Sequence, residues 1–218
     1  MKKILSVLLS ALIILSVFSV GAFATEAEPT KLEKWGETYD WDNGISVKTR
    51  ILANNISLDI LFNIVTYMKD GKTALIINFD GKEFKAVTKD DALCIFMTKL
   101  PLFHYKITGS IFNSIDSDLT SEKLSFVRGY EAEYEEKTFY VEEYLYESDD
   151  QSMTLKFYFD GDELKVFGSE EKIDDMDTEI YFEIIPGEID DEVFEMPWYS
   201  IDVTRLVDFI LMLGIVSL

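Results

Sequence analysis

Cysteine and histidine each occur only once in the 218 residues, as Cys94 and His104. One cysteine cannot form a disulfide within the chain, so the stability of the fold has to come from a buried core. The sequence has no Cys and His residues at the spacing of a zinc site, and no Ser-His-Asp order typical of a catalytic triad. We therefore expect neither a metal site nor a cofactor. Cys94 lies in an apolar run, which predicts an inert buried thiol. The alternative is a Cys-His enzyme, in which Cys94 is the nucleophile and His104 its base.

Basic residues are also scarce, because 20 Lys and Arg oppose 41 Asp and Glu, for a formal net charge of −21. Nucleic-acid binding depends on clustered Lys and Arg that displace counterions, so this composition argues against a nucleic-acid partner. It also disfavours docking on anionic lipid headgroups. The simplest interpretation of the excess of carboxylates is a solvated surface in a saline extracellular medium. A surface that binds calcium ions is the alternative. Hydrophobic residues make up 48% of the chain, enough for one packed domain.

Charge is absent between Lys3 and Glu26. The stretch 1–24 begins with Lys2 and Lys3, continues as an apolar run and closes on Ala22-Phe23-Ala24, with small residues at the two positions that a signal peptidase reads. It predicts a secretory signal cleaved after Ala24, and hence a secreted or extracytoplasmic protein of a bacterial cell envelope. An uncleaved membrane anchor is the alternative, since the run approaches the length of a bilayer span.

Alternation of apolar and polar residues begins after Gly44 and recurs toward residue 202, which is typical of strands buried on one face. We expect about ten strands, among them 45–51, 57–69, 72–79, 103–107, 138–146, 153–159 and 178–184. Asp-Gly pairs at 70–71 and 80–81 separate alternating runs and predict tight hairpin turns. Asp160-Gly161-Asp162 is interpreted in the same way, as a turn and not a metal loop.

The predicted fold is all-β with minor α content: a curved antiparallel meander sheet, or open half-barrel, over 44–202. Residues 25–43 are polar and are predicted to form an extended lead-in. The least regular stretch, 110–123, is predicted to be a loop or short helix that joins two halves of the sheet. The apolar segment 203–218 is predicted to pack on the sheet, with a membrane-interface or partner-binding tail as the alternative. It is too short to cross a bilayer, so no stable membrane span is expected after signal cleavage.

Acidic pairs such as Glu142-Glu143 are frequent in this sequence. Two carboxylates at a defined separation can hydrolyse a glycosidic bond, but with so many pairs the signal has little specificity. The stretch 116–122 resembles the start of a calcium loop. It has Ser121 where the loop requires glycine, and Val127 stands in place of the final glutamate. We therefore predict that the protein is not an enzyme, and a carboxylate-pair glycoside hydrolase ranks third among the hypotheses.

Aromatic side chains are abundant, with 16 Phe, 11 Tyr and 3 Trp, and many fall on alternating strand positions. One apolar face of an open sheet has to be covered by helices, a lid, a second sheet or a ligand. Two interpretations follow from this composition. Either the chain seals its own core, or it encloses a cavity for an acyl chain or an apolar peptide.

Three stretches together resemble a known family. They are VEEYLYESDDQSMTLKFYFDGDELKVF (141–167), PGEIDDEVFEMPWY (186–199) and YMKDGKTALIINFDGKEFKAV (67–87). Their order over 44–198 resembles secreted lipoprotein carriers of the LolA/LolB/LppX-like group. The resemblance implies a strongly curved sheet around a hydrophobic cavity lidded by helices, which carries lipid or lipidated protein. It implies no catalytic residues.

The leading hypothesis is an exported, non-enzymatic protein that binds or carries a lipid or a lipidated partner in the concave face. Strand phase and the resemblance together select eight cavity-lining candidates: Phe62, Ile64, Leu75, Ile77, Leu155, Phe157, Ile180 and Phe182. The alternative is an extracellular interaction or structural module with a filled core.

Overall fold

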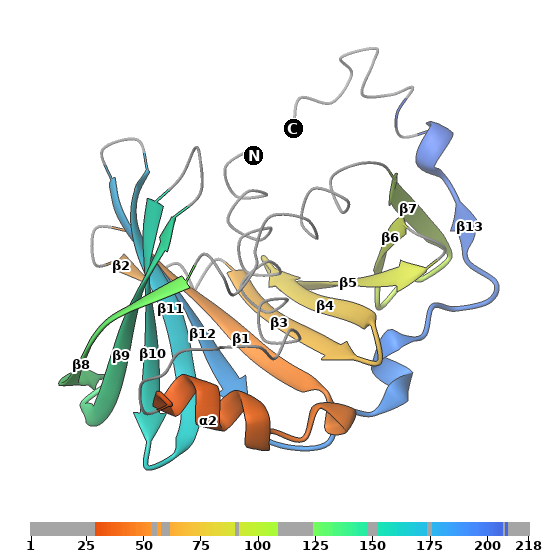
Figure 1. Cartoon of the computed structure of the whole chain (residues 1–218). Helices are drawn as coiled ribbons and strands as arrows, with labels where there is room; N and C mark the ends of the chain where they lie inside the picture. The colour runs from red at the N-terminus through yellow and green to blue at the C-terminus, as the bar shows by residue number, and fades with distance from the viewer. Residues whose placement is uncertain are drawn as a thin grey trace.

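The structure, a computed structural model, describes residues 29–53, 56–57, 62–89, 92–108, 124–147, 152–173, 176–206 and 208. These residues form one open, curved sheet with short helical segments beside it (Figure 1). The described strands pair antiparallel, except for a short parallel pairing at one edge. The predicted all-β class and open curved sheet are confirmed.

The helical segments are α2 (Lys31–Thr38), η1 (Trp41–Asn43) and η3 (Asp191–Phe194). The strands follow in chain order: β1 (Ile45–Ala53), β2 (Ile56–Ser57), β3 (Phe62–Lys69), β4 (Lys72–Phe79), β5 (Lys82–Lys89), β6 (Ala92–Met97), β7 (Phe103–Thr108), β8 (Leu124–Tyr134), β9 (Lys137–Glu147), β10 (Ser152–Asp160), β11 (Glu163–Ile173), β12 (Met176–Ile185) and β13 (Ile201–Asp202).

Strand order divides the sheet into two halves on either side of β1. Neighbouring strands follow the order β13-β7-β6-β5-β4-β3-β1-β12-β11-β10-β9-β8, and β2 pairs with β1. The chain runs outward from β1 to β7, resumes at the opposite edge with β8, and returns to β1 through β12. We call the two sides the β3–β7 half and the β8–β12 half. The predicted connector 110–123 lies outside the described residues.

The predicted hairpin turns are present. Asp70-Gly71 and Asp80-Gly81 each have two successive residues at positive φ, between 48° and 71°, as a two-residue type I′ turn requires. Asp160-Gly161-Asp162 also closes a hairpin, between β10 and β11, with Gly161 at φ 64°. Lys31 of α2 lies 3.0 Å from Asp162, and Lys137 lies 2.6 Å from Asp160. The carboxylates of Asp160 and Asp162 in this turn therefore form ion pairs with lysines of the same chain.

The prediction of an extended lead-in over 25–43 is wrong where the structure describes it, because Lys31–Thr38 is the helix α2. Thr30 caps its first turn: the Glu33 backbone N–H donates to the Thr30 hydroxyl, and the Thr30 backbone N–H donates to the Glu33 carboxylate. A helix of eight residues is marginal alone, so packing has to stabilise it. Leu32 and Trp35 provide that packing, since both are buried against the sheet.

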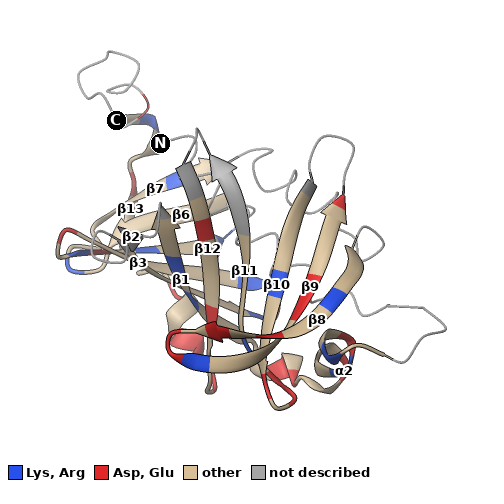
Figure 2. Cartoon of the chain, turned by 90° about the vertical axis from the view of Figure 1, so that its left-hand side faces the viewer, with Lys and Arg blue, Asp and Glu red and all other residues tan. Residues whose placement is uncertain are grey.

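The sheet is covered on both faces in different places. The inner face, defined here as the face on which α2 lies, carries the main core, shared by α2, β1 and β9–β12. On the outer face, the β8–β9 hairpin bends across β10–β12 (Figure 2) and encloses a smaller aromatic cluster. The outer face of the β3–β7 half is covered by the segment around η3, which packs Val193, Phe194 and Met196 on β3–β6.

Both chain ends extend beyond the described residues. The predicted signal 1–24 lies outside them, as does most of the segment 203–218 that was predicted to pack on the sheet. At the start of that segment Leu206 is exposed, and Asp208 accepts a hydrogen bond of 2.9 Å from the Tyr105 hydroxyl. No helix in the described ranges is long and apolar enough to span a bilayer.

Candidate apolar-ligand site on the inner face

The strand register places the predicted cavity residues on one face. Directly paired residues of antiparallel strands project to the same side of a sheet. One row of pairs runs across eight strands of the sheet: Phe157, Phe167, Phe182, Thr49, Ile64, Ile77, Phe84 and Met97. Adjacent rows contain the remaining candidates Leu155, Ile180 and Leu75. Phe62 pairs with Phe79 at the end of β3, and its side chain is outside the described set.

In the β8–β12 half, this face is closed by protein. Leu155, Phe157, Ile180 and Phe182 are all at most 2% exposed, and they share one core with Leu32 and Trp35 of α2. Their rings pack on one another: Phe157 stacks on Phe167 at 6.3 Å and Phe167 on Phe182 at 5.0 Å between centroids. Side chains of the same chain therefore make the contacts that a ligand would make here.

In the β3–β7 half, the same face is apolar but only partly covered. Ile64 and Leu75 are buried, whereas Ile77, Phe84, Ile95 and Met97 are half-buried. The described part of the chain places α2 and η1 over β1 and β10–β12, and no described helix over the inner face of β4–β6 (Figure 1). Four of the eight candidates thus lie in the covered core and four on the strands of the more open half.

Sequence reasoning missed Phe84, Ile95 and Met97 as members of the inner face. The signal was present in ALCIFM (92–97), where Cys94 and Phe96 alternate with Ile95 and Met97. Register assigns Cys94 to the outer face, where it is fully buried beneath the segment around η3. Its predicted burial is confirmed.

A buried carboxylate docks α2 on the inner face. Glu142 of β9 is 2% exposed and accepts hydrogen bonds from the backbone N–H groups of Lys31 (2.7 Å) and Leu32 (2.9 Å). The first N–H groups of a helix have no partner within it, and the helix dipole favours a negative charge there. The Tyr144 hydroxyl lies 3.2 Å from Glu142 and 2.8 Å from Thr30, and burial raises the pKa of Tyr144, so it remains a donor.

The neighbouring carboxylate, Glu143, projects to the opposite face. Adjacent residues in a strand point to opposite sides, so Glu142 and Glu143 cannot flank one glycosidic bond. Arg128 donates to Glu143 at 3.0 Å and the Tyr130 hydroxyl at 3.2 Å. Partial burial opposes ionisation of Glu143, but these hydrogen bonds outweigh it and lower its pKa. The most visible acidic pair in the sequence therefore performs two separate structural roles.

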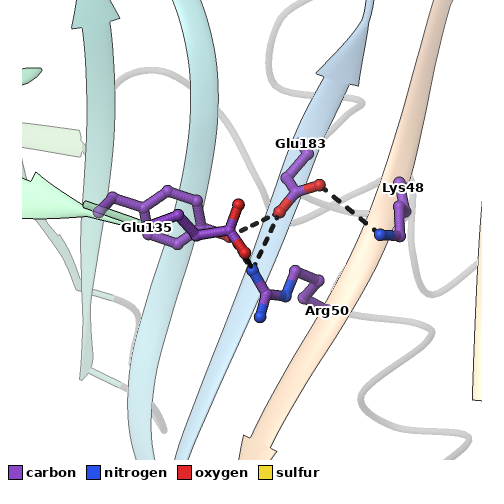
Figure 3. Close-up of polar contacts among 5 residues, drawn as sticks. Lys48, Arg50, Glu135 and Glu183 are labelled. Carbon is purple, nitrogen blue, oxygen red and sulfur yellow. Dashed lines mark hydrogen bonds and ion pairs between the residues drawn. The ribbon is translucent and has the colours of Figure 1, made fainter. Parts of the chain in front are cut away.

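A polar cluster fixes the β8–β9 hairpin to the outer face (Figure 3). The Tyr134 hydroxyl donates to Glu183 at 2.8 Å, Arg50 lies 3.4 Å from the same carboxylate, and Arg50 also pairs with Glu135. Lys48 adds a weaker contact to Glu183 at 3.9 Å. Burial raises the pKa of Tyr134, so the phenol stays protonated. Because Arg50 bridges both carboxylates, we interpret the cluster as a clasp and not as a catalytic pair.

Glu135 and Glu136 form the tip of this hairpin, and both have positive φ, 48° and 64°. Positive φ is unfavourable for residues with a Cβ, so the tip needs support from its surroundings. The ion pair between Glu135 and Arg50 supplies such support. Sequence reasoning found no turn here because the turn lacks glycine.

No cluster of three His, Cys, Asp or Glu side chains suited to a metal occurs within the described ranges. The candidate calcium stretch 116–122 lies outside those ranges. His104, the second residue of the Cys-His alternative, is buried and has its Nδ1 3.0 Å from the Ser200 hydroxyl. Burial lowers the pKa of His104.

Comparison with known proteins adds no family to this description: no protein-family model matches the chain, and no curated protein matches it. The function is therefore argued from the geometry of the inner face.

Proposed function

We propose that the protein binds or carries an apolar ligand, a lipid or the acyl chain of a lipidated partner, without catalysing a reaction on it. The site is the inner face of the β3–β7 half, centred on Ile77, Phe84, Ile95 and Met97. One observation supports it most. A single apolar row crosses the sheet, and it is sealed by α2 on one side but only half-buried on the other. Water-exposed apolar surface of this kind favours an apolar occupant.

Thr49 supports the same proposal from the centre of the row. It lies between Phe182 and Ile64 and is 4% exposed. Its hydroxyl is buried and has no hydrogen-bond partner among the residues that the structure describes, which costs free energy unless something satisfies it. An acyl chain whose ester or carboxyl oxygen reached this point would accept that hydrogen bond. The favoured ligand is therefore an amphiphile and not a pure hydrocarbon.

The first test is direct. The protein is purified without detergent and extracted with organic solvent, and co-purifying lipid is sought by mass spectrometry. Binding of an environment-sensitive apolar dye is measured in parallel. Phe84→Ser should lower lipid content and dye binding several-fold. Phe126→Ser, which removes an exposed phenylalanine from the edge strand β8, is the matched control and should change neither. Equal lipid content in both variants would contradict the proposed site.

Thr49→Val gives a sharper test, because the two side chains are nearly the same shape. In protein stripped of lipid, loss of this buried, unsatisfied hydroxyl should raise the free energy of unfolding by about 1 kcal/mol, measured by urea denaturation. The same variant should retain less lipid than the wild type. A variant that is more stable than the wild type and retains the same amount of lipid would show that Thr49 does not contact the ligand.

The C-terminal residues 209–218 provide a competing occupant. Asp208 contacts Tyr105, whose side chain shares the inner face with Ile95, so the chain approaches this face just before that segment. If residues 209–218 occupied the site, their deletion would raise dye binding, and the protein would be the filled-core interaction module of the alternative hypothesis. The covered core of the β8–β12 half favours this filled-core alternative. A wild-type protein that carries no lipid and binds no dye would establish the filled-core alternative.

Export is part of the proposal. The stretch 1–24 supports secretion with cleavage after Ala24. Sequencing the N-terminus of protein recovered from outside the cytoplasm should read from Thr25. An N-terminus at Met1 in the membrane fraction would instead indicate an uncleaved anchor.

A further inference from the structure

The edge of the β3–β7 half carries an exposed apolar patch. Two distant segments, 100–103 and 198–201, meet there: the Ile201 backbone N–H donates to Leu102 at 2.8 Å, and β13 pairs in parallel with β7. Six apolar side chains exposed by more than a third lie in these segments: Leu100, Leu102, Phe103, Trp198, Tyr199 and Ile201. We call them the edge patch. Scattered single apolar residues are ordinary on a surface, but a contiguous group is not.

Trp198 is the most informative member, because it is 93% exposed. Within the described part of the chain, its ring makes an edge contact with Tyr199, at 5.7 Å between centroids. A tryptophan in that position contributes little to the stability of the fold. Trp and Tyr side chains with an apolar body and a polar tip are enriched where proteins meet the membrane–water interface.

The charge around the edge patch differs from that of the whole chain. The segments 96–108 and 196–208 contain three cations, Lys99, Lys106 and Arg205, and two carboxylates, Asp202 and Asp208, so they are close to neutral although the chain as a whole has a net charge of −21. Asp202 is itself compensated: Lys106 lies 3.2 Å away, and hydrogen bonds from Thr204 hold its pKa below the usual range. This surface therefore does not repel the phosphate groups of lipid headgroups, while the rest of the molecule disfavours an anionic membrane.

The sequence that follows continues the apolar character. Leu206 is exposed next to the edge patch, and from 207 to 218 the only charged residue is Asp208. From these observations we infer that the edge patch docks on a neutral, zwitterionic lipid bilayer, with Trp198 and Ile201 entering the interface and Lys99 and Arg205 reaching the headgroup phosphates. The edge patch adjoins the proposed lipid site, because the β6–β7 register sets Phe103 beside Met97 on the inner face, whereas Ile201 lies on β13, beyond β7.

The test uses the exported protein and phosphatidylcholine vesicles. The chain has three tryptophans; Trp35 is buried and Trp41 half-buried, so quenching by acrylamide reports mainly on Trp198. We expect vesicles to shift the emission of Trp198 to the blue and to protect it from acrylamide. Trp198→Phe should abolish both changes. A double variant, Trp198→Ser with Ile201→Ser, should lower vesicle binding in flotation by at least about tenfold.

Phe126→Ser with Val127→Ser is the matched control, because it removes two exposed apolar side chains from the opposite edge of the sheet. It should bind vesicles as the wild type does. Thermal unfolding should show that neither double variant is destabilised, since all four side chains are exposed. Vesicle binding that is equal in the two double variants would overturn the inference.

Two other occupants would also overturn it. If Trp198 were already protected from acrylamide without vesicles in a monomer, another part of the chain would cover the edge patch. If light scattering showed a dimer that Trp198→Ser with Ile201→Ser converts to a monomer, and the wild type did not bind vesicles, the occupant would be a second copy. Vesicle binding is measured on protein stripped of lipid, so failure here leaves the proposed lipid site to its own test.

Discussion

The two halves of the sheet present the same face in the same register but differ in what covers it. In the β8–β12 half, Phe157 and Phe182 lie beneath α2 and are almost completely buried. In the β3–β7 half, Phe84 and Met97 continue the same row and remain half-buried. The outer faces do not differ in this way, because the η3 segment covers Cys94 and Phe96 in the β3–β7 half and the β8–β9 hairpin covers Tyr158 in the β8–β12 half. On the inner face, the protein thus places its main core in one half and leaves partly exposed apolar surface in the other.

The alternation of residues along a strand therefore identifies which side chains share a face, but not whether another part of the chain covers that face. The same alternation of apolar residues occurs in a buried core and in a binding surface. Which of the two forms depends on whether another element of the chain covers the row. Here that element is an eight-residue helix, which Leu32 and Trp35 pack on the sheet and the carboxylate of Glu142 anchors at its N-terminus. The comparison can be tested by removing, in turn, a core side chain, the anchor of the helix and the clasp on the outer face.

The largest effect is expected for truncation of the covered core. Phe157→Ala should lower the free energy of unfolding by about 3–5 kcal/mol, because it leaves a cavity among Tyr144, Phe167 and α2. Urea denaturation measures this value, with Phe126→Ala as the exposed control at well under 1 kcal/mol. A cost for Phe157→Ala as small as that of the control would mean that the β8–β12 half is not the rigid core.

The anchor of α2 comes next. Glu142→Ala leaves two backbone N–H groups at the helix N-terminus without their charged acceptor, so we expect a loss of about 2–3 kcal/mol. Hydrogen exchange should accelerate at Lys31 and Leu32 more than in the central strands. Binding of an apolar dye should rise, since loosening α2 uncovers the aromatic row. Unchanged exchange at these two amides would show that Glu142 does not hold the helix.

A smaller effect is expected at the clasp. Arg50→Met should cost about 1 kcal/mol, because the ion pairs of Arg50 with Glu135 and Glu183 are partly open to solvent. Proteolysis at the tip around Glu136 should become faster while the core melts nearly as before. Lys48→Met, which removes the longer contact to Glu183, is the control and should have little effect.

The smallest effect is a pH dependence at Glu143. Its pKa is lowered in the folded state, so its contribution is complete above the unfolded pKa of about 4.3 and is lost as the pH falls through the folded pKa. Between about pH 5 and pH 3, the unfolding free energy of the wild type should therefore fall more steeply than that of Glu143→Gln. Parallel slopes would indicate that the contact with Arg128 contributes nothing measurable, as for many exposed ion pairs.

Several features of the fold follow from local residue patterns. Asp70-Gly71 and Asp80-Gly81 predict their own turns because few other pairs adopt two successive positive φ angles. The turn at Glu135-Glu136 escaped prediction, since contacts with Arg50 and not local preference stabilise it. The helix α2 escaped too, although Thr30 and Glu33 form a capping box, because eight residues have little intrinsic helicity.

Local sequence patterns predict the all-β class, the hairpin turns, the burial of Cys94 and which side chains of one strand share a face. Those properties depend on the period-two alternation of a strand and on turn chemistry, which act over a few residues. Tertiary contacts determine that β1 pairs with β12, that Glu142 anchors a helix over one half, and that Trp198 stands exposed near the β7–β13 edge. Those outcomes depend on contacts between residues more than a hundred positions apart or on how the chain packs at its edge, which no local pattern encodes.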